Sequence, residues 1–414
     1  MPWTVSSVMQ ERLRFIEEWA EERKPRSLLC REYGISRKTG YALWERFRRE
    51  GLSALEDGSR RPADCPHRTP PDVVERLLAL RGRHPLWGPK KLARLLEEEG
   101  LRSPACSTIA EILKRHGLSR PQRRRRHELP CSPPLVEATA PNMVWSTDFK
   151  GHFYVGTGER CDPLTVMDLS SRYLLVCHGY FTGPGKVRQE EVIDVYHDLF
   201  LRRGLPRFIV SDNGGPFASA APGGLTKLSA FWIRLGITPL RIESGKPQQN
   251  GRLERLHRTL KSEVARPARR TVGEQKASLK SFMEEYNNLR PHEALGMETP
   301  SQRHHDPATP WDGIIPDPVF PEEAIPRRVT RAGGLKWHGR MYRMPMALAN
   351  QEVGLVPVDD GQGRMLIYLC RYCVGTLELS RGRILQAPRQ AQLLRLLEAG
   401  EERASPVVVD GVTL

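Results

Sequence analysis

The stretch Phe208-Ile-Val-Ser-Asp-Asn-Gly-Gly215 sets three apolar residues directly before an acidic turn. A short apolar run that ends in turn-forming residues is typical of a buried strand. Before it, residues 144–154, 164–168 and 173–178 predict three consecutive strands, and residues 187–203 predict an amphipathic helix. After it come a predicted helix at 225–235, a strand at 237–240 and a helix at about 248–265. This order predicts an α/β core at residues 143–305, with a mixed sheet and helices on both faces.

Residues 1–62 predict an all-α helix-turn-helix unit. Its second helix should end at Gly34, where glycine forms a left-handed cap at little cost, and Ser36 is placed to cap a third helix that runs to about Glu50. Arg37 and Lys38 open this third helix and would meet base edges and phosphates of DNA. Three aromatic residues of the same helix are expected to face the core: Tyr41, Trp44 and Phe47. A trihelical module that binds no DNA is the alternative.

Residues 68–118 predict a second helix-turn-helix-like unit, in which Trp87-Gly-Pro89 opens the middle helix and Ser107 could cap the last one. Two such units suggest a bipartite DNA reader, although small helical cores also occur without that role. Residues 119–142 form a basic, proline-rich linker that is expected to follow phosphates, with a solvated charge run as the alternative. Four consecutive arginines lie in it: Arg123, Arg124, Arg125 and Arg126.

Residues 325–385 predict a small all-β barrel, because short strands alternate with glycine-containing turns. Lys336, Arg340 and Arg343 would make one edge of this domain basic. The sequence leaves open whether that edge binds DNA or another subunit. Residues 386–414 form a C-terminal tail.

The charge of the chain favours a polyanionic partner. The 414 residues carry a formal net charge of +15, so nucleic acid is the first candidate and an acidic membrane surface the second. No run of about 18 apolar residues and no signal-peptide pattern is found, and we expect a soluble, intracellular protein. Cys370 and Cys373 alone have Cys-x-x-Cys spacing, and no second pair of ligands lies near them in the sequence. We therefore expect reduced thiols and no zinc.

Three acidic side chains lie in order along the predicted core: Asp148 in its first strand, Asp212 at the end of its fourth and Glu254 on a later helix. Carboxylates that a fold brings together repel one another unless cations neutralise them, so a cluster would imply divalent metal. Two magnesium ions about 4 Å apart could activate a water molecule or a 3′-hydroxyl against a phosphodiester. For any one of these acids considered singly, an ordinary surface charge is the alternative.

Four motifs carry a specific family resemblance: Trp145-Ser-Thr-Asp148-Phe, Ser211-Asp-Asn-Gly-Gly-Pro-Phe217, Pro247-Gln-Gln-Asn-Gly-Arg-Leu-Glu-Arg-Leu-His257 and Tyr286-Asn-Asn-Leu-Arg-Pro-His292. They resemble the integrase-core DDE transposases of bacterial insertion sequences, which are similar in core to retroviral integrases. The order of helix-turn-helix units, basic linker, core and β-rich tail also resembles this family. The resemblance therefore spans most of the chain.

The resemblance implies a ribonuclease H-like core in which Asp148, Asp212 and Glu254 bind Mg²⁺ or Mn²⁺, as two ions. Asn213 and Gly214 would shape the turn beside Asp212. Four residues near Glu254 would contact DNA: Asn250, His257, Arg258 and Lys261. For Asn250 the alternative is a position behind the metal ligands that supports them, and for the other three it is a solvated basic face. The implied partners are double-stranded DNA, as element ends and target, and further copies of the chain, with no membrane. The implied location is the bacterial cytoplasm, at the nucleoid.

The chain departs from the family pattern in one respect. The interval from Asp212 to Glu254 is longer than is usual, and we place the excess in a flexible surface loop at residues 218–224. Glu243 and Glu263 are nominal competitors of Glu254. Asp168 is interpreted as a hairpin residue in preference to a fourth ligand. No His/Cys zinc domain like that of retroviral integrases is found at the N-terminus.

The resemblance implies a transposase that binds the terminal inverted repeats of its element, cuts to expose 3′-hydroxyls and joins them to target DNA by direct transesterification. A non-catalytic transcriptional regulator derived from such an enzyme is the main alternative. This alternative conflicts with the intact triad, since a protein that has lost catalytic activity has no physical reason to retain three mutually repelling acids. A nuclease that only hydrolyses DNA is a third possibility, because hydrolysis and strand transfer use the same metals.

Overall fold

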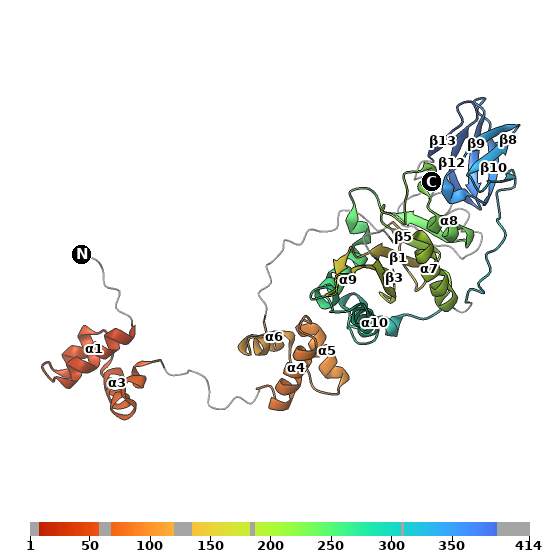
Figure 1. Cartoon of the computed structure of the whole chain (residues 1–414). Helices are drawn as coiled ribbons and strands as arrows, with labels where there is room; N and C mark the ends of the chain where they lie inside the picture. Colours follow the sequence, from red (N-terminus) through yellow and green to blue (C-terminus); the bar gives the residue numbers. More distant parts are fainter. Residues whose placement is uncertain (1–7, 58–67, 120–134, 183–186, 308–309, 387–414) are drawn as a thin grey trace. The chain divides into compact units, whose positions relative to one another are not determined.

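The computed structural model describes residues 8–57, 68–119, 135–182, 187–307 and 310–386. The chain divides into two compact units, residues 1–72 and 73–414. Figure 1 shows their helices and strands. The linker arginines Arg123 to Arg126 and the tail at 387–414 lie outside the described residues.

The N-terminal unit contains three helices, α1 (Val8–Ala20), α2 (Arg26–Glu32) and α3 (Arg37–Glu50), and a 3-10 turn, η1 (Gly51–Leu55). Its caps follow the sequence: Gly34 has φ of +64°, and the Ser36 hydroxyl accepts a hydrogen bond from the Thr39 backbone N–H at 3.1 Å. The expected placement of the aromatic residues was wrong for Tyr41. Trp44 and Phe47 pack against the core, whereas Tyr41 is 45% exposed, with its ring edge-on to Trp19 at 5.0 Å.

Three further helices form the second helical segment: α4 (Pro71–Arg83), α5 (Pro89–Glu98) and α6 (Cys106–Arg115). Leu77, Leu92, Leu96 and Ile109 are fully buried between them. Pro89 opens α5 as predicted, but Ala105 holds the N-cap position of α6. Ser107 is therefore a residue of the first turn rather than its cap.

The core sheet has the strand order β4-β3-β1-β5-β6. Its strands are β1 (Val144–Phe149), β3 (Arg160–Asp168), β4 (Leu174–Thr182), β5 (Phe208–Ser211) and β6 (Thr238–Arg241), and a short strand, β2 (Phe153–Tyr154), also pairs with β3. The first three are antiparallel, whereas β5 is parallel to both β1 and β6. The predicted continuous strand 144–154 is split into β1 and β2, because the chain turns at Gly151, which has φ of +81°.

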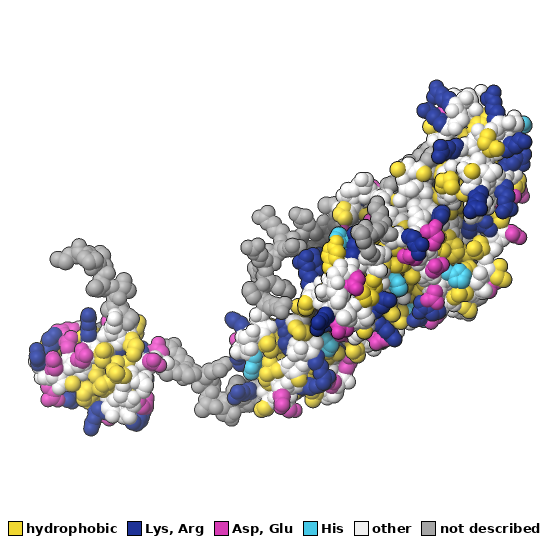
Figure 2. Space-filling model, in the orientation of Figure 1, with side chains coloured by type: hydrophobic (Ala, Val, Ile, Leu, Met, Phe, Trp, Pro, Cys, Tyr) yellow, Lys and Arg dark blue, Asp and Glu magenta, His cyan; other side chains and the backbone are white. Residues whose placement is uncertain are grey.

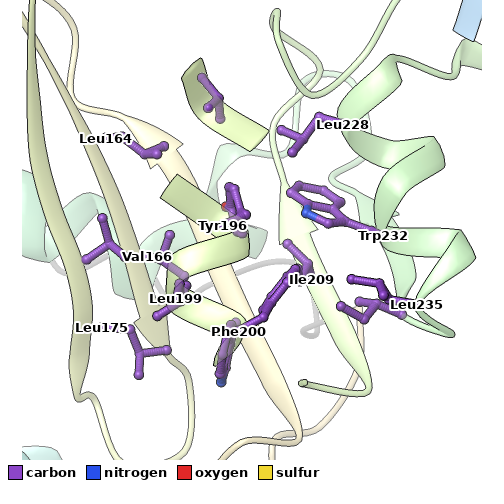
Figure 3. Close-up of a cluster of buried hydrophobic side chains, with 14 of the residues drawn as sticks. Leu164, Val166, Leu175, Tyr196, Leu199, Phe200, Ile209, Leu228, Trp232 and Leu235 are labelled. Carbon is purple, nitrogen blue, oxygen red and sulfur yellow. The ribbon is translucent and has the colours of Figure 1, made fainter. Parts of the chain in front are cut away.

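Helices cover both faces of this sheet, because neighbouring strand residues point to opposite sides. Trp145 and Ile209 pack with α7 (Gln189–Arg203) and α8 (Lys227–Arg234) on one face, the cluster drawn in Figure 3. Val144, Phe208 and Val210 pack with α9 (Gly251–Leu260) and α10 (Val272–Asn288) on the other. A 3-10 turn, η3 (Pro247–Asn250), precedes α9 and a π-helical turn, η4 (Lys261–Ala265), follows it. Beyond α10 lie η5 (Glu293–Leu295) and α11 (Pro300–Arg303). The core is thus the predicted α/β structure with a mixed sheet.

The C-terminal strands form a five-stranded antiparallel sheet of order β13-β12-β11-β10-β7 and a separate hairpin, β8-β9. Their bounds are β7 (Ile325–Arg328), β8 (Gly334–Trp337), β9 (Arg340–Arg343), β10 (Glu352–Val358), β11 (Arg364–Leu369), β12 (Tyr372–Glu378) and β13 (Arg383–Gln386), with a 3-10 turn, η6 (Met346–Leu348), after β9. The all-β content agrees with the sequence, but β7 and β13 are edges in this pairing, so closure into a barrel stays a prediction. Lys336, Arg340 and Arg343 are exposed, and Lys and Arg side chains are prominent on the visible face of this domain (Figure 2).

The loop at 218–224 packs against the protein, contrary to the predicted free surface loop. It contains a 3-10 turn, η2 (Pro222–Gly224), in which Gly223 has φ of +76°. A Cβ atom on Gly223 would lie 2.6 Å from Cγ1 of Val374 in β12, so glycine permits this close approach. The insertion therefore lies against the C-terminal sheet. In the part of the chain that the structure describes, no helix is long and apolar enough to cross a membrane.

Candidate active site

Asp148 and Asp212 lie at the same level on neighbouring parallel strands. Ser146 of β1 pairs with Val210 of β5, and each aspartate follows its paired residue by two positions. Since side-chain direction repeats every second residue, both carboxylates project from the face that carries Val144 and Phe208. This is the face that α9 covers, so strand register brings the two aspartates together although 63 residues separate them.

The turn after β5 is shaped around the carboxylate of Asp212. The Gly214 N–H donates a hydrogen bond to Asp212 Oδ1 at 3.0 Å. A Cβ atom at Gly214 would lie 2.9 Å from Asp212 Oδ2, so only glycine fits this position without moving the carboxylate. The Asn213 amide donates to the carbonyl oxygen of Ile242 at 2.8 Å and ties this turn to the end of β6. Both residues therefore stabilise the turn beside Asp212.

Glu254 comes to the same site from α9. Leu253, Leu256 and Leu260 are buried against the sheet and hold the helix in place, while Glu254 is exposed. The nominal competitors have other partners: Glu263 forms a bidentate pair with Arg290 at 2.9 and 3.1 Å, and Glu243 pairs with Lys246. The charge of Glu254 acts on Asp148.

The three carboxylates interact electrostatically. Burial, as the largest cause, and the negative charges of Asp212 and Glu254 together raise the pKa of Asp148 to about 7. Within the described ranges, no group of three His, Cys, Asp or Glu side chains is close enough together to hold a metal ion. The acids are therefore adjacent and mutually repelling, but they do not converge on one point.

The raised pKa of Asp148 predicts that the metal-free protein loses folding stability as pH rises. Between the unfolded pKa of about 4 and the folded pKa of about 7, the folded state binds more protons than the unfolded state, so stability falls as pH rises. In EDTA, Asp148→Asn should match wild type below pH ~4 and exceed it by roughly 2–4 kcal/mol above pH ~7, at about 1.4 kcal/mol per pKa unit. Urea unfolding of both proteins across this range measures the difference. A constant difference at all pH values would contradict the raised pKa, and the exposed-site variant Asp198→Asn is the control.

Asn250 and His257 require a correction, because both side chains are buried rather than open to DNA. Asn250 is 5% exposed, and its side-chain oxygen accepts the Ser146 hydroxyl proton on the sheet below. His257 is 8% exposed, with Nε2 at 2.7 Å from Thr165 Oγ1 and Nδ1 at 3.7 Å from Asp148 Oδ2. Burial lowers the pKa of His257 to about 4, so the imidazole is neutral. Helical periodicity predicts that these residues share a face with Glu254, but it does not predict how closely α9 packs against the sheet.

Basic side chains lie near Asp148, because the charge of Lys150 interacts with Asp148 and with the charges of Lys261 and Arg266. Arg258 and Lys261 are exposed, as expected for DNA contacts. The sequence reasoning missed two others, Lys150 and Arg266. Burial lowers the pKa of Lys150, and the charges of Lys261 and Arg266 lower it further. The position of Lys150, two residues after Asp148 and thus on the same side, was a signal that could have identified it.

The remaining predicted positions fall into two groups. Arg37 and Lys38 are exposed in the first turn of α3. Asp168 is fully buried, and its carboxylate accepts hydrogen bonds from the Asn142 N–H and from the N–H and hydroxyl of Ser171, each at 2.7 Å. It therefore organises the β3–β4 hairpin, as interpreted from the sequence.

Domain families match most of the described chain. The family described as Integrase core domain matches residues 138–247, and a second family of the same description matches residues 235–300. A Helix-turn-helix domain matches residues 11–63, and a Homeodomain-like domain matches residues 39–113. The matched core ranges contain all three candidate acids.

Curated relatives come from insertion elements and retroviruses. The chain is 28% identical over 235 residues to a 31.7 kDa protein of insertion element IS407 from Burkholderia multivorans, covering 56% of this chain and 79% of that protein. It is 27% identical over 227 residues to a 39.2 kDa protein of insertion element IS476 from Xanthomonas euvesicatoria, covering 54% of this chain and 57% of that protein. A Gag-Pol polyprotein of baboon endogenous virus is 26% identical over 43% of this chain and 10% of its own length.

Solved structures with some similarity are retroviral. The HTLV-2 integrase catalytic core domain in complex with magnesium matches with 17% identity and a TM-score of 0.31, covering 41% of this chain and all of that one. The simian T-cell lymphotropic virus intasome in complex with a PP2A regulatory subunit matches with 21% identity and a TM-score of 0.35, covering 69% of this chain and 93% of that chain.

Proposed function

We propose that this chain, which is an integrase-core protein related to those of bacterial insertion elements, is a DNA transposase that cuts and joins DNA strands at Asp148, Asp212 and Glu254. The observation that carries the proposal is the register of β1 and β5, which sets Asp148 and Asp212 level on the face covered by α9, where Glu254 adds its charge. A strongly basic chain has a physical reason to keep mutually repelling acids next to one another if they serve a cation-dependent reaction on a polyanion.

The donor set suits magnesium or manganese. All three side chains offer carboxylate oxygens, which hard divalent cations prefer, and burial together with the charges of the other two acids raises the pKa of Asp148. Asp148, Asp212 and Glu254 would hold the metal, as two ions. When bound, divalent ions activate a nucleophilic oxygen and neutralise the charge that develops on a phosphodiester.

The other residues of the site would orient the DNA and the acids. Exposed Arg258 and Lys261 would bind backbone phosphates beside the carboxylates, together with Lys150, whose charge interacts with Lys261 and Asp148. Gly214 holds the Asp212 carboxylate through its N–H. These contacts would keep a phosphodiester near the acids while the DNA strand is cut and its 3′-hydroxyl is transferred.

The helical units would recognise the ends of the element. Arg37 and Lys38 open α3, the third helix of a matched helix-turn-helix domain, and such helices enter the major groove by their first turns. The protein would first bind double-stranded DNA that carries the terminal inverted repeats and would then bind target DNA. Because two ends must join one target, the working form is a homo-multimer on DNA.

A DNA-binding regulator without catalysis is the second candidate function. It rests on the matched helix-turn-helix domains alone and needs none of the carboxylate geometry. Binding of DNA ends without any cleavage would favour it.

Removal of metal should abolish the reaction. The test incubates wild-type protein with a labelled duplex that carries the sequence flanking its gene, and with a second unlabelled duplex. In Mg²⁺ or Mn²⁺ we expect 3′-ends at defined positions and their joining to the second duplex, and in EDTA neither product. Because metal-assisted activation supplies several kcal/mol, the loss should reach about a thousand-fold, with about 1.4 kcal/mol per factor of ten. Equal cleavage in EDTA, or defined binding with no cleavage in either metal, would contradict the proposal.

A further inference from the structure

The motif that begins at Tyr286 lies beside the turn that leads into β4. The Asn287 side chain bonds both backbone groups of Leu174, accepting from its N–H at 2.8 Å and donating to its carbonyl oxygen at 2.9 Å. Arg172 lies in this turn, two residues before Leu174. Its charge acts on Tyr286 and on His292, whose rings pack edge-on at 4.8 Å. The contact between the turn and the end of α10 therefore brings Arg172 and His292 close together.

Positive charge is concentrated near His292. Burial, as the largest cause, and the charges of four cations lower the pKa of this imidazole to about 3: Lys91, Arg290, Arg172 and Arg255. Burial, followed by the charge of Arg290, likewise lowers the pKa of Lys91 to about 8. The charges that act on the imidazole are therefore all positive.

The acids near Arg172 and Arg290 leave much of this charge without a direct partner. Asp168, the acid whose charge acts on Arg172, instead accepts hydrogen bonds from the backbone and side chain of the hairpin, each at 2.7 Å. Glu263 binds Arg290 through both of its oxygens, at 2.9 and 3.1 Å. Neither acid therefore neutralises the guanidinium of Arg172 by direct contact.

Two features of Arg172 are unfavourable in the free protein. Its backbone has φ of +62°, a left-handed conformation that glycine or asparagine adopts more readily than arginine. Its Nη1 is buried and has no hydrogen-bond partner among the described residues, and the same holds for Nε2 of His292. Burial of a charged or polar group without a partner costs free energy. The turn alone does not favour arginine at this position, whereas an anion that accepts from these groups would offset the cost.

We propose that Arg172 and His292, with Arg290 and Lys91 near them, form a binding site for a phosphate group of the DNA backbone. Guanidinium N–H groups match phosphate oxygens in both charge and geometry, and an imidazole N–H can donate one further hydrogen bond. The side chains of Arg172, His292 and Lys91 are half-buried, so the cluster reaches the surface.

A basic residue of α9 connects this cluster with the acidic site. Arg255 follows Glu254 directly and is exposed, and its charge acts on both Arg172 and His292. Positive charge therefore continues from the acids to the phosphate site. The inference rests on the proposed function, because it takes the DNA of that reaction as the ligand, and it adds a backbone contact away from the reacting phosphodiester.

Three substitutions separate the role of Arg172 from those of net charge and of the turn. Arg172→Asn removes the guanidinium and places a residue that tolerates the left-handed conformation. Arg172→Lys keeps the charge but loses the planar set of donors. Arg202→Asn removes one positive charge from an exposed residue of α7 that pairs with Asp198, and it is the matched control.

The experiment measures DNA binding by the full chain in EDTA over a series of salt concentrations. Arg172→Asn should weaken binding of an end duplex and of an unrelated duplex by the same factor, about tenfold. It should also lower the slope of log affinity against log salt by about 1, because one phosphate contact is lost. Arg172→Lys should keep the wild-type slope, and Arg202→Asn should keep both slope and affinity. Equal slopes and affinities in wild type and Arg172→Asn would overturn the inference, as would an equal loss in Arg202→Asn.

Inorganic phosphate distinguishes the source of the ligand. At matched ionic strength, phosphate should raise the urea unfolding midpoint of wild type more than that of Arg172→Asn. If it does so while both proteins bind DNA equally, the site takes free phosphate and the assignment to DNA is wrong. A markedly lower midpoint of Arg172→Asn without phosphate, together with weaker DNA binding, would assign Arg172 to the turn and overturn the inference.

Failure of the proposed function gives a different result. Wild type that binds DNA with the expected dependence on Arg172 but never cuts it would remove that function and leave the phosphate site standing. Full cutting, with wild-type binding and salt slope in Arg172→Asn, would remove the phosphate site alone.

Discussion

Asp212→Asn should lower DNA cleavage and joining by about a thousand-fold or more, while DNA binding is unchanged. Asparagine keeps the shape of the side chain, and its carbonyl oxygen can still accept the Gly214 N–H that now bonds Asp212 at 3.0 Å. The turn after β5 should therefore keep its conformation. The variant loses one negative charge and one carboxylate that would bind the metal. A metal-dependent stabilisation of the transition state by several kcal/mol corresponds to a rate loss of about a thousand-fold.

Single-turnover cleavage of an end duplex, with binding measured in parallel, checks this prediction. Asp198→Asn is the control, because Asp198 is an exposed acid of α7 that pairs with Arg202. It should cut and join at the wild-type rate. Full cleavage by Asp212→Asn would remove Asp212 from the site, and loss of binding together with cleavage would show that the turn had been disrupted instead.

Trp232→Ala should be the most destabilising single change in the catalytic core. The indole of Trp232 is fully buried, 5.1 Å from the ring of Tyr196 and 6.3 Å from that of Phe217, in the cluster that Figure 3 shows. Phe217 in turn packs at 5.9 Å from Phe149, the residue after Asp148. Truncation of a buried tryptophan costs about 3–5 kcal/mol, a large part of the roughly 5–15 kcal/mol that stabilises a typical domain.

Urea unfolding of the full chain, followed by a signal from the core, measures the change. Trp232→Phe is the matched comparison. It keeps an aromatic ring in the cluster and removes an indole N–H that has no hydrogen-bond partner among the described residues, so its loss should be clearly smaller. Equal midpoints for the two variants would show that the cluster does not depend on the ring.

Much of the fold could be predicted because local sequence signals agree with tertiary packing. Gly34 ends α2 with a left-handed backbone, Ser36 begins α3 by capping a backbone N–H, and the apolar run 208–210 lies in β5. The strands of the C-terminal domain were found, but their closure depends on long-range pairing that periodicity does not encode. The packed loop at 218–224 was missed for a similar reason, since its contact with Val374 joins residues distant in sequence.

The candidate site was predicted in part. Motif resemblance gave Asp148, Asp212 and Glu254, and strand register then explains how the two aspartates meet. The environments of their neighbours could not be predicted. From the sequence alone, a histidine three residues after Glu254 could either contact DNA or be buried beneath α9. The packing of α9 on the sheet distinguishes these roles, since it leaves His257 only 8% exposed. Tyr41 shows the opposite error, because its aromatic ring suggested burial whereas the structure leaves it 45% exposed.

We propose that Glu254 completes an acidic site with Asp148 and Asp212. The most direct test compares wild type, Glu254→Gln and Glu243→Gln in the Mg²⁺-dependent joining of an end duplex to a second DNA. Glu243 is exposed and paired with Lys246 outside the site, so its variant controls for the loss of a nearby charge. We expect joining by wild type and Glu243→Gln and none by Glu254→Gln, with equal DNA binding by all three. Joining by Glu254→Gln at the wild-type rate would contradict it.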